Sequence, residues 1–344
     1  MTHPDYAVVI AVDTAEKVIP SVESFLKLPA SERPSEIYVS TGRNPSLQRN
    51  IGLNLCKSPL VYFLDEDSWV IPGTPTLLMN HFQGQRTAAA GGPNLPYPDC
   101  SNFEKTASGV LASWLGSFKV RNRYASIGSV KEATEKDLIL CNMMVRKEAF
   151  QKANGFRTDL YPNEENEFLN RLLHQEYQLI YDPAAAIYRP RRKNFWAFCW
   201  QAFRYGRGRA RQMKVYPCLS DLVHMIPFFF AVYVITLLTP LLPLPDFPFK
   251  SWVVSPYWRI PFYLFLALAF GTGASVVSWL RHALDFIGVP VLIFLRHFFY
   301  GVGLFVGLVT PLPKRPTDIP IQIYQVKITG DRYKLIPLQS GKQR

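Results

Sequence analysis

Two carboxylates separated by one residue follow a short apolar run. The sequence LVYFLDEDS (Leu60–Ser68) places Asp65 and Asp67 directly after five apolar residues. With this spacing both side chains can reach the same side of a turn, and their oxygens are ligands that Mg²⁺ and Mn²⁺ prefer. A solvated turn that ends a strand can carry the same pattern. The position after a buried strand favours a metal site.

A second group of acids lies about a hundred residues further on, in the segment Pro162–Arg171. Apolar residues at Phe168 and Leu172 have helical spacing, so Glu164 and Glu165 fall in the first turn of a predicted helix. Acids at that position also stabilise the helix dipole. From the residues alone, a structural role and a role as a general base therefore both remain open.

The chain around the first acids alternates between strand patterns and helix patterns. Strands are expected at Tyr6–Val12, Glu36–Ser40 and Leu60–Leu64, and helical segments at Glu16–Leu28 and Ser46–Cys56. This alternation predicts a parallel sheet flanked by helices. Ligands bind beyond the carboxyl ends of the strands in such sheets, which is where Asp65 and Asp67 lie.

Composition limits the class of protein. The 344 residues are enough for about two domains. The net charge is +12, with 48% hydrophobic, 14% aromatic and 19% charged residues, which excludes a disordered chain. Five cysteines without C-x-x-C spacing favour neither a disulfide framework nor a zinc site, and they suit a reducing, cytoplasm-facing location. The N-terminus has no signal-peptide pattern.

The apolar residues are concentrated after residue 220. Leu222–Pro245 and Ile260–Leu280 contain no Asp, Glu, Lys or Arg, and each is long enough to cross a membrane, which takes about 20 apolar residues. Buried core helices are the alternative. A third stretch, Phe286–Pro313, contains Arg296, which would be costly in lipid and is expected to face protein, water or headgroups.

The membrane topology predicted from charge does not fit three full spans. Three spans would place the residues after 313 opposite the N-terminal domain. Those residues carry five Lys and Arg side chains between 314 and 334, and basic segments prefer the cytoplasmic side. Two spans plus a re-entrant or interfacial segment are therefore favoured, with both parts in the cytoplasm.

A basic, aromatic segment, Tyr188–Lys214, lies between the two halves and contains no acid. Nucleic-acid binding is disfavoured because a membrane span follows so closely. An interfacial helix held by anionic lipids and an arginine site for substrate phosphates are both consistent with this composition.

Several motifs, in order, resemble an inverting family 2 glycosyltransferase of the GT-A fold with a membrane-anchored C-terminus. They lie at Ala7–Val12, Ser46–Ser68, Cys141–Phe156, Asn163–Leu172, Tyr181–Pro183 and Gln201–Arg209. The last motif, with Tyr188–Arg192, is similar to the branch that elongates lipid-linked repeat units of bacterial exopolysaccharides such as succinoglycan. The resemblance implies a Rossmann-like mixed sheet in residues 1–187, an interfacial segment in 188–219, membrane helices in 220–313 and a basic tail in 314–344.

The resemblance also implies roles for the acids. Asp65 and Asp67 match the D-x-D positions that contact Mg²⁺ or Mn²⁺ and the nucleotide diphosphate. Glu165 stands where the family has an Asp as catalytic base, and Glu164 is the alternative. Donor-pocket positions by the same comparison are Ala11, Asp13, Gly42, Gln48, Arg49 and Asn50, and positions for the diphosphate or acceptor are Gln201, Arg204, Tyr205 and Arg207.

Two departures from the family pattern bear on specificity. Residues Val39–Gly42 lack the Asp pair with which many relatives bind the nucleobase, and Tyr205 replaces the Trp of the motif typical of processive synthases.

The function expected from the resemblance is transfer of a sugar from a nucleotide-sugar donor to a membrane-confined acceptor linked to polyprenyl diphosphate. The reaction would proceed with inversion, in polysaccharide biosynthesis at the cytoplasmic membrane. The alternatives are a processive polysaccharide synthase and a membrane-tethered nucleotide-binding scaffold without activity.

Overall fold

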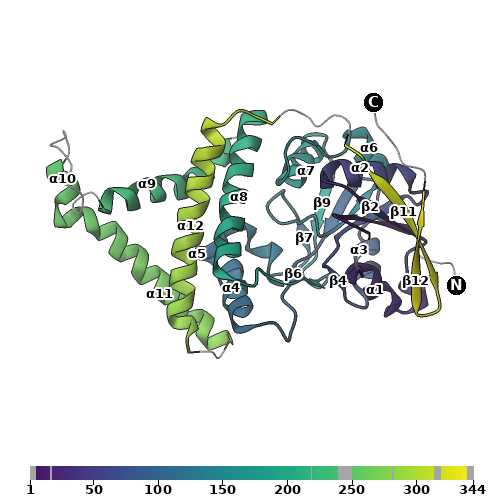
Figure 1. The fold of residues 1–344 in the computed structure, drawn as a ribbon, viewed down its shortest axis with the longest axis horizontal. Helices are drawn as coiled ribbons and strands as arrows, with labels where there is room; N and C mark the ends of the chain where they lie inside the picture. The colour runs from purple at the N-terminus through teal and green to yellow at the C-terminus, as the bar shows by residue number, and fades with distance from the viewer. Residues whose placement is uncertain are drawn as a thin grey trace. The chain divides into compact units, whose positions relative to one another are not determined.

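The computed structural model describes residues 5–15, 18–217, 219–238, 250–280, 283–313 and 319–338. The chain divides into two units, each built from separate stretches of sequence (Figure 1). Unit 1 contains residues 1–99, 119–190 and 313–344, and unit 2 contains residues 100–118 and 191–312. The chain therefore leaves unit 1 after Pro190 and returns to it at Pro313.

Among the described residues of unit 1, nine strands form one sheet in the order β12-β11-β2-β1-β3-β8-β5-β9-β7, and three short strands form a second sheet in the order β4-β10-β6. The strands are β1 (Tyr6–Val12), β2 (Glu36–Thr41), β3 (Leu60–Asp65), β4 (Trp69–Val70), β5 (Thr87–Gly91), β6 (Asn94–Leu95), β7 (Lys131–Glu132), β8 (Asn142–Arg146), β9 (Gln178–Tyr181), β10 (Ile187–Tyr188), β11 (Gln322–Thr329) and β12 (Arg332–Pro337). The helices of this unit are α1 (Pro20–Leu26), α2 (Pro45–Leu55), α3 (Thr74–Asn80), α6 (Lys147–Lys152) and α7 (Glu164–His174).

The centre of the large sheet is parallel and its flanks are mixed. Strand β1 pairs in parallel with both β2 and β3, so the carboxyl ends of these three strands meet at one edge. Strand β8 is antiparallel to β3 and to β5. The predicted α/β sheet is therefore present, with the mixed strand directions that the resemblance implies.

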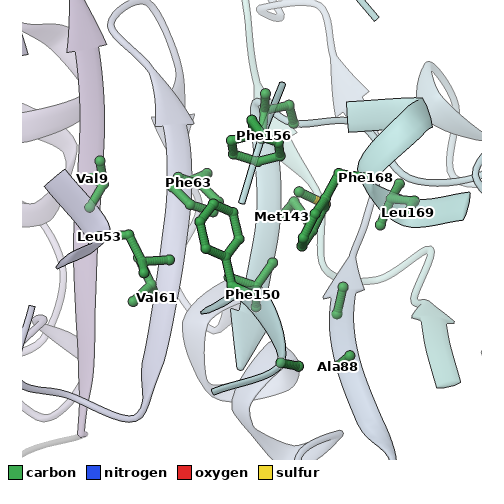
Figure 2. Close-up of a cluster of buried hydrophobic side chains, with 14 of the residues drawn as sticks. Val9, Leu53, Val61, Phe63, Ala88, Met143, Phe150, Phe156, Phe168 and Leu169 are labelled. Atoms are coloured by element: carbon green, nitrogen blue, oxygen red, sulfur yellow. The ribbon is translucent and has the colours of Figure 1, made fainter. Parts of the chain in front are cut away.

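An aromatic cluster packs the helices onto this sheet. Figure 2 shows Phe63 of β3 beside Phe150 of α6, with Phe156 and Phe168 completing the group. The ring centroids of Phe150 lie 4.9 Å from those of both Phe156 and Phe168, and such pairs stabilise a core beyond their buried area. This cluster ties β3, which ends at Asp65, to helix α7.

The C-terminal strands close one edge of the sheet. Strand β11 is antiparallel to β2, with Ile323 opposite Ser40, and the yellow β11–β12 hairpin lies at the edge of the purple strands in Figure 1. Ile321 and Ile323 are buried in the main core. Residues 314–344, expected as a basic tail, thus include two strands of the large sheet.

Unit 2 is helical. Its helices are α4 (Asn102–Ala112), α5 (Trp114–Ser117), α8 (Phe195–Val215), α9 (Ile226–Leu238), α10 (Lys250–Val254), α11 (Ile260–Leu280) and α12 (Asp285–Val309). Within the described ranges, three helical stretches are long and apolar enough to cross a membrane: Asp221–Leu238, Pro256–Val277 and Asp285–Val309. The expected first span ran to Pro245, and its residues from 239 onward lie outside the described part of the chain.

Helices α8 and α12 run side by side and approach each other through glycines (Figure 1). A Cβ atom on Gly303 would lie 2.0 Å from the carbonyl oxygen of Phe203, and one on Gly206 would lie 2.0 Å from that of Tyr300. No larger side chain fits at these positions without separating the helices, as in the close helix contacts of membrane proteins.

The charged residue in the third apolar stretch faces protein. Arg296 is buried, and its Nε donates a hydrogen bond to the carbonyl oxygen of Gly116 at 2.7 Å. The neighbouring His297 hydrogen-bonds the carbonyl oxygen of Leu115 at 2.8 Å. Helix α5 thus supplies the polar partners that this part of α12 requires.

The observed element boundaries differ from the expected ones in several places. Strand β2 ends at Thr41 rather than at Ser40, and α2 spans Pro45–Leu55 rather than Ser46–Cys56. Helix α1 begins at Pro20 rather than at residue 16, and residues 16 and 17 lie outside the described part. Strand β3 includes Asp65. Residues 100–118, expected within the catalytic domain, belong to unit 2, whereas residues 188–190 belong to unit 1.

Candidate active site

Asp65 and Asp67 lie at the carboxyl end of β3, as the sequence predicts. The N–H of Ser68 donates to the carbonyl oxygen of Asp65 at 3.1 Å, which closes a tight turn around the two acids. Their side chains are 22% and 38% exposed. Both carboxylates are therefore accessible to a ligand, beside Ala11, which is paired with Asp65 in the sheet.

One guanidinium group spans both carboxylates. The Nη2 of Arg189 lies 2.8 Å from Oδ2 of Asp65, and its Nε lies 2.8 Å from Oδ1 of Asp67. Arg189 directly follows β10, and its backbone is held against β6, because its N–H donates to the carbonyl oxygen of Leu95 at 2.8 Å.

A second guanidinium group links the two acidic stretches of the sequence. Arg49, on α2, places Nη2 at 2.6 Å from Oδ1 of Asp65 and Nη1 at 3.1 Å from Oε1 of Glu164. Because one planar fork contacts both carboxylates, their nearest oxygens lie within about 8 Å of each other. Acids 99 positions apart in the sequence thus share one site.

Glu164 is the most deeply buried acid of this group, with its side chain 2% exposed. Burial, together with the neighbouring charge of Glu165, raises its pKa from 4.5 to about 7, and the attraction of Arg49 opposes that rise. Its Oε2 accepts the N–H of Asn163 at 3.1 Å. Both oxygens of Glu164 are therefore engaged within the protein.

Glu165 is the more accessible of the two glutamates, with its side chain 14% exposed. Nη1 of Arg123 lies 3.5 Å from its Oε1. The same guanidinium binds the side chain of Asn166 and the carbonyl oxygens of Glu135 and Lys136. Arg123 thereby fixes the beginning of α7, where both glutamates lie.

The remaining donor-pocket candidates surround the carboxyl ends of β1 and β2. Nε2 of the buried Gln48 donates to the carbonyl oxygens of Val12, at 2.7 Å, and of Ser40, so Gln48 ties the two strand ends together. Asn50 instead makes two hydrogen bonds with the backbone of Phe156, at 2.8 and 2.9 Å. Gly42 and Asp13 follow β2 and β1, respectively.

The candidates for the diphosphate and acceptor lie on α8 in unit 2. Nε2 of Gln201 donates to the hydroxyl of Tyr205 at 3.2 Å, and the guanidinium of Arg207 lies 5.9 Å from the ring centroid of Phe203. Arg204 occupies the same helix. Their role in catalysis stays a prediction.

The donor set of the D-x-D pair fits a divalent cation. Two carboxylates at a strand end offer hard oxygen ligands and leave room for water and phosphate oxygens, which suits Mg²⁺ and Mn²⁺. Three of the four oxygens contact Arg49 or Arg189. A cation that binds both acids must therefore take at least one Asp65 oxygen that these arginines now contact.

Two residues of the site were not identified from the sequence. Arg189 was grouped with the interfacial segment, although its position directly after a strand in the YRPRR run was a usable signal. Arg123 had no such signal, because it follows no recognisable motif and contacts the acids only in the folded chain.

The sheet order, the D-x-D pair at the end of β3 and the acids at the start of α7 together define a nucleotide-sugar transferase domain of the GT-A type. A family model described as "Glycosyl transferase family group 2" matches residues 60–302. The chain belongs to this family of glycosyltransferases.

Individual relatives agree with this assignment. Over 128 residues the chain is 30% identical to the succinoglycan biosynthesis protein ExoA of Rhizobium meliloti, and this match covers 37% of each protein. A solved structure of the mannosyltransferase PcManGT from Pyrobaculum calidifontis, in complex with GDP-Man and Mn²⁺, covers 90% of this chain. The match covers 88% of that protein with a TM-score of 0.50 at 12% identity, which supports the fold alone.

Proposed function

We propose that this glycosyltransferase moves one sugar from a nucleotide-sugar donor to a lipid-linked saccharide at the membrane, with inversion, in the synthesis of a cell-surface polysaccharide. The observation that carries the proposal is the Arg49 bridge, because it joins the D-x-D acids to the acids of α7. An inverting displacement needs the D-x-D acids and the acids of α7 close to one anomeric carbon.

Glu165 is proposed as the base that takes the proton of the acceptor hydroxyl. It is more exposed than Glu164, whose two oxygens are held by Arg49 and by the N–H of Asn163. Glu164 then holds Arg49 in place. A single base within hydrogen-bond reach contributes typically ~10²–10⁴-fold to the rate.

Asp65 and Asp67 are proposed to hold Mg²⁺ or Mn²⁺ on the donor side. When bound, the cation supplies positive charge that stabilises the departing diphosphate. The PcManGT complex contains Mn²⁺, which supports this cofactor class. On the same side, Gln48 fixes the ends of β1 and β2, next to Ala11, Asp13 and Gly42.

A lipid-linked acceptor is supported by the apolar helices and by the match to a succinoglycan biosynthesis protein. A membrane-confined acceptor meets a membrane-bound enzyme at high effective concentration. The basic residues of α8, including Arg204 and Arg207, would then bind the diphosphate of the donor or of the lipid.

The test is transfer by the purified full-length protein. A panel of nucleotide sugars is offered with a polyprenyl-diphosphate-linked saccharide and Mn²⁺ or Mg²⁺, and products are analysed by mass spectrometry and NMR. We expect addition of one sugar with the anomeric configuration opposite to that of the donor. A ladder of products would instead support a processive synthase, and retained configuration would exclude the inverting mechanism.

Variants distinguish the role of the metal-binding acids from the role of the base. Asp67→Asn is expected to abolish metal-dependent transfer, and Glu165→Gln to lower it by about 10²–10⁴-fold. Glu148→Gln is the matched control, because Glu148 is an exposed acid on α6 that forms an ion pair with Lys152, away from the acids of the site. Near-normal turnover of Glu165→Gln would show that the base is wrongly assigned.

A further inference from the structure

We propose that Arg189 is an exchangeable counter-ion of the D-x-D pair. In the absence of donor it holds Asp65 and Asp67, and it exchanges these carboxylates for the diphosphate when cation and nucleotide bind together. Arg189 would thus be a positioning residue that couples the two ligands. The inference rests on the proposed metal role of Asp65 and Asp67.

The guanidinium of Arg189 contacts both acids of the D-x-D pair. Two adjacent nitrogens of one guanidinium, Nη2 and Nε, each lie 2.8 Å from a different carboxylate. A cation shared by Asp65 and Asp67 needs oxygens from the same two groups. Arg189 and a shared cation therefore compete for the pair.

The short strands around Arg189 hold its backbone in place. Residue Tyr188 of β10 pairs with Trp69 of β4 on one side and with Leu95 of β6 on the other. Strand β4 begins two residues after Asp67. The backbone of Arg189 is therefore fixed beside the acids, and release requires rotation of its side chain only.

Charge balance favours a diphosphate as the new partner. Arg49 and Arg189 offset the charges of Asp65 and Asp67, and Arg49 is shared with Glu164. A divalent cation added to this set brings further positive charge, which a nucleoside diphosphate would offset. Since guanidinium groups bind phosphate oxygens in the same forked geometry as carboxylates, the diphosphate is a suitable new partner for Arg189.

The inference predicts that bare cation binds weakly and that nucleotide strengthens its binding. Mn²⁺ titrations of the full-length protein in detergent, followed by the EPR signal of free Mn²⁺, measure this with no nucleotide, with UDP and with GDP. Removing the competing arginine by Arg189→Gln is expected to tighten Mn²⁺ binding without nucleotide by about tenfold or more, as expected for a contact between charged groups. The further tightening of Mn²⁺ binding by the nucleotide should be smaller in this variant than in wild type.

Arg192→Gln is the matched control, because it removes the same charge three residues away at an exposed position; it should behave as wild type. Arg189→Lys keeps the charge but cannot span both acids, so it should give an intermediate affinity, and it serves if the Gln variant does not fold. Unchanged or weaker Mn²⁺ binding in the folded variant would overturn the inference.

Asp67→Asn separates this result from the metal assignment. If wild-type Mn²⁺ binding survives Asp67→Asn, the proposed metal site is wrong. If that binding is lost while Arg189→Gln brings no tightening, the metal site stands and only the role of Arg189 fails.

Discussion

At the scale of single residues, the site is a chain of alternating charges. Arg189 and Arg49 both contact Asp65, and Arg49 continues to Glu164. Because Glu164 is buried, its ionisation depends on this arrangement more than on solvent. The stability of Glu164 and Arg49 variants therefore tests whether the two acidic stretches share a site in solution.

The raised pKa of Glu164 predicts a pH dependence of stability. The folded protein holds this proton up to a pKa of about 7, whereas the unfolded chain releases it near 4.5. The free energy of unfolding therefore loses a contribution as pH rises from about 4.5 to about 7. Glu164→Gln stays neutral, so its melting temperature relative to wild type should increase between pH 5 and pH 8. A constant difference would contradict the pKa.

Removal of Arg49 should be costly. In Arg49→Gln, Asp65 and Glu164 lose the cation that they share, and breaking a buried ion pair by deleting one partner costs about 3–5 kcal/mol. We expect a lower unfolding free energy in chemical denaturation at pH 8, above the pKa of Glu164. Arg43→Gln, at an exposed position just before α2, is the control. Equal stability of both variants would argue against the bridge.

The D-x-D acids and the acids of α7 were predictable from the sequence because each follows a local pattern, a buried strand or a helix start. The contacts that link these two groups of acids were not predictable from the sequence. Arg49 is on α2 and contacts acids 16 and 115 positions away, and Arg189 contacts Asp67 over 122 positions. No periodicity relates such positions, since the contacts arise only when β1, β3 and β10 are in place.

At the scale of elements, short-range patterns gave β1, β2 and β3 to within one residue. The apolar runs that form these strands are continuous because both faces are covered. The β11–β12 hairpin was missed for the opposite reason. Its residues are mostly exposed or half-buried, carry several basic side chains and follow the apolar helices. Composition alone suggested a tail.

The packing of α8 on α12 gives a prediction at this scale. Gly303→Ala places a Cβ atom 2.0 Å from the carbonyl oxygen of Phe203, and overpacking of this kind costs about 1–3 kcal/mol. We expect a lower melting temperature in detergent. Gly271→Ala on α11 is the matched control, because its Cβ atom would have no heavy atom within 4 Å. A loss of stability shared by both variants would mean that helix contact is not the cause.

At the scale of the whole molecule, the return of the chain to unit 1 limits its membrane topology. Residues 191–312 leave unit 1 and come back to it, and β11 then pairs with β2 through four residue pairs. Thr41 adds a hydrogen bond to the carbonyl oxygen of Gln322 at 3.3 Å. Both ends of the apolar region must therefore lie on the same side of a membrane, which requires an even number of crossings.

Three described helical stretches are long enough to cross, so at least one of them should not be a complete span. This agrees with the basic residues after 313, which favour the side that holds the N-terminal domain. Single cysteines at exposed positions, in a background without native cysteines, test the arrangement. Asp331→Cys lies in the β11–β12 turn, and Gln85→Cys precedes β5.

We expect a membrane-impermeant maleimide to label Asp331→Cys and Gln85→Cys from the same side, in inside-out vesicles and not in intact cells. Tyr257→Cys and Ala283→Cys, at exposed positions near opposite ends of α11, should be labelled from opposite sides if that helix crosses. Labelling of Asp331→Cys from the side opposite to Gln85→Cys would contradict the pairing of β11 with β2, because a strand cannot join a sheet across a bilayer. An odd number of membrane crossings would separate β11 and β12 from the rest of the sheet. Their pairing with β2 therefore fixes the residues after 313 on the same side of the membrane as the N-terminal strands.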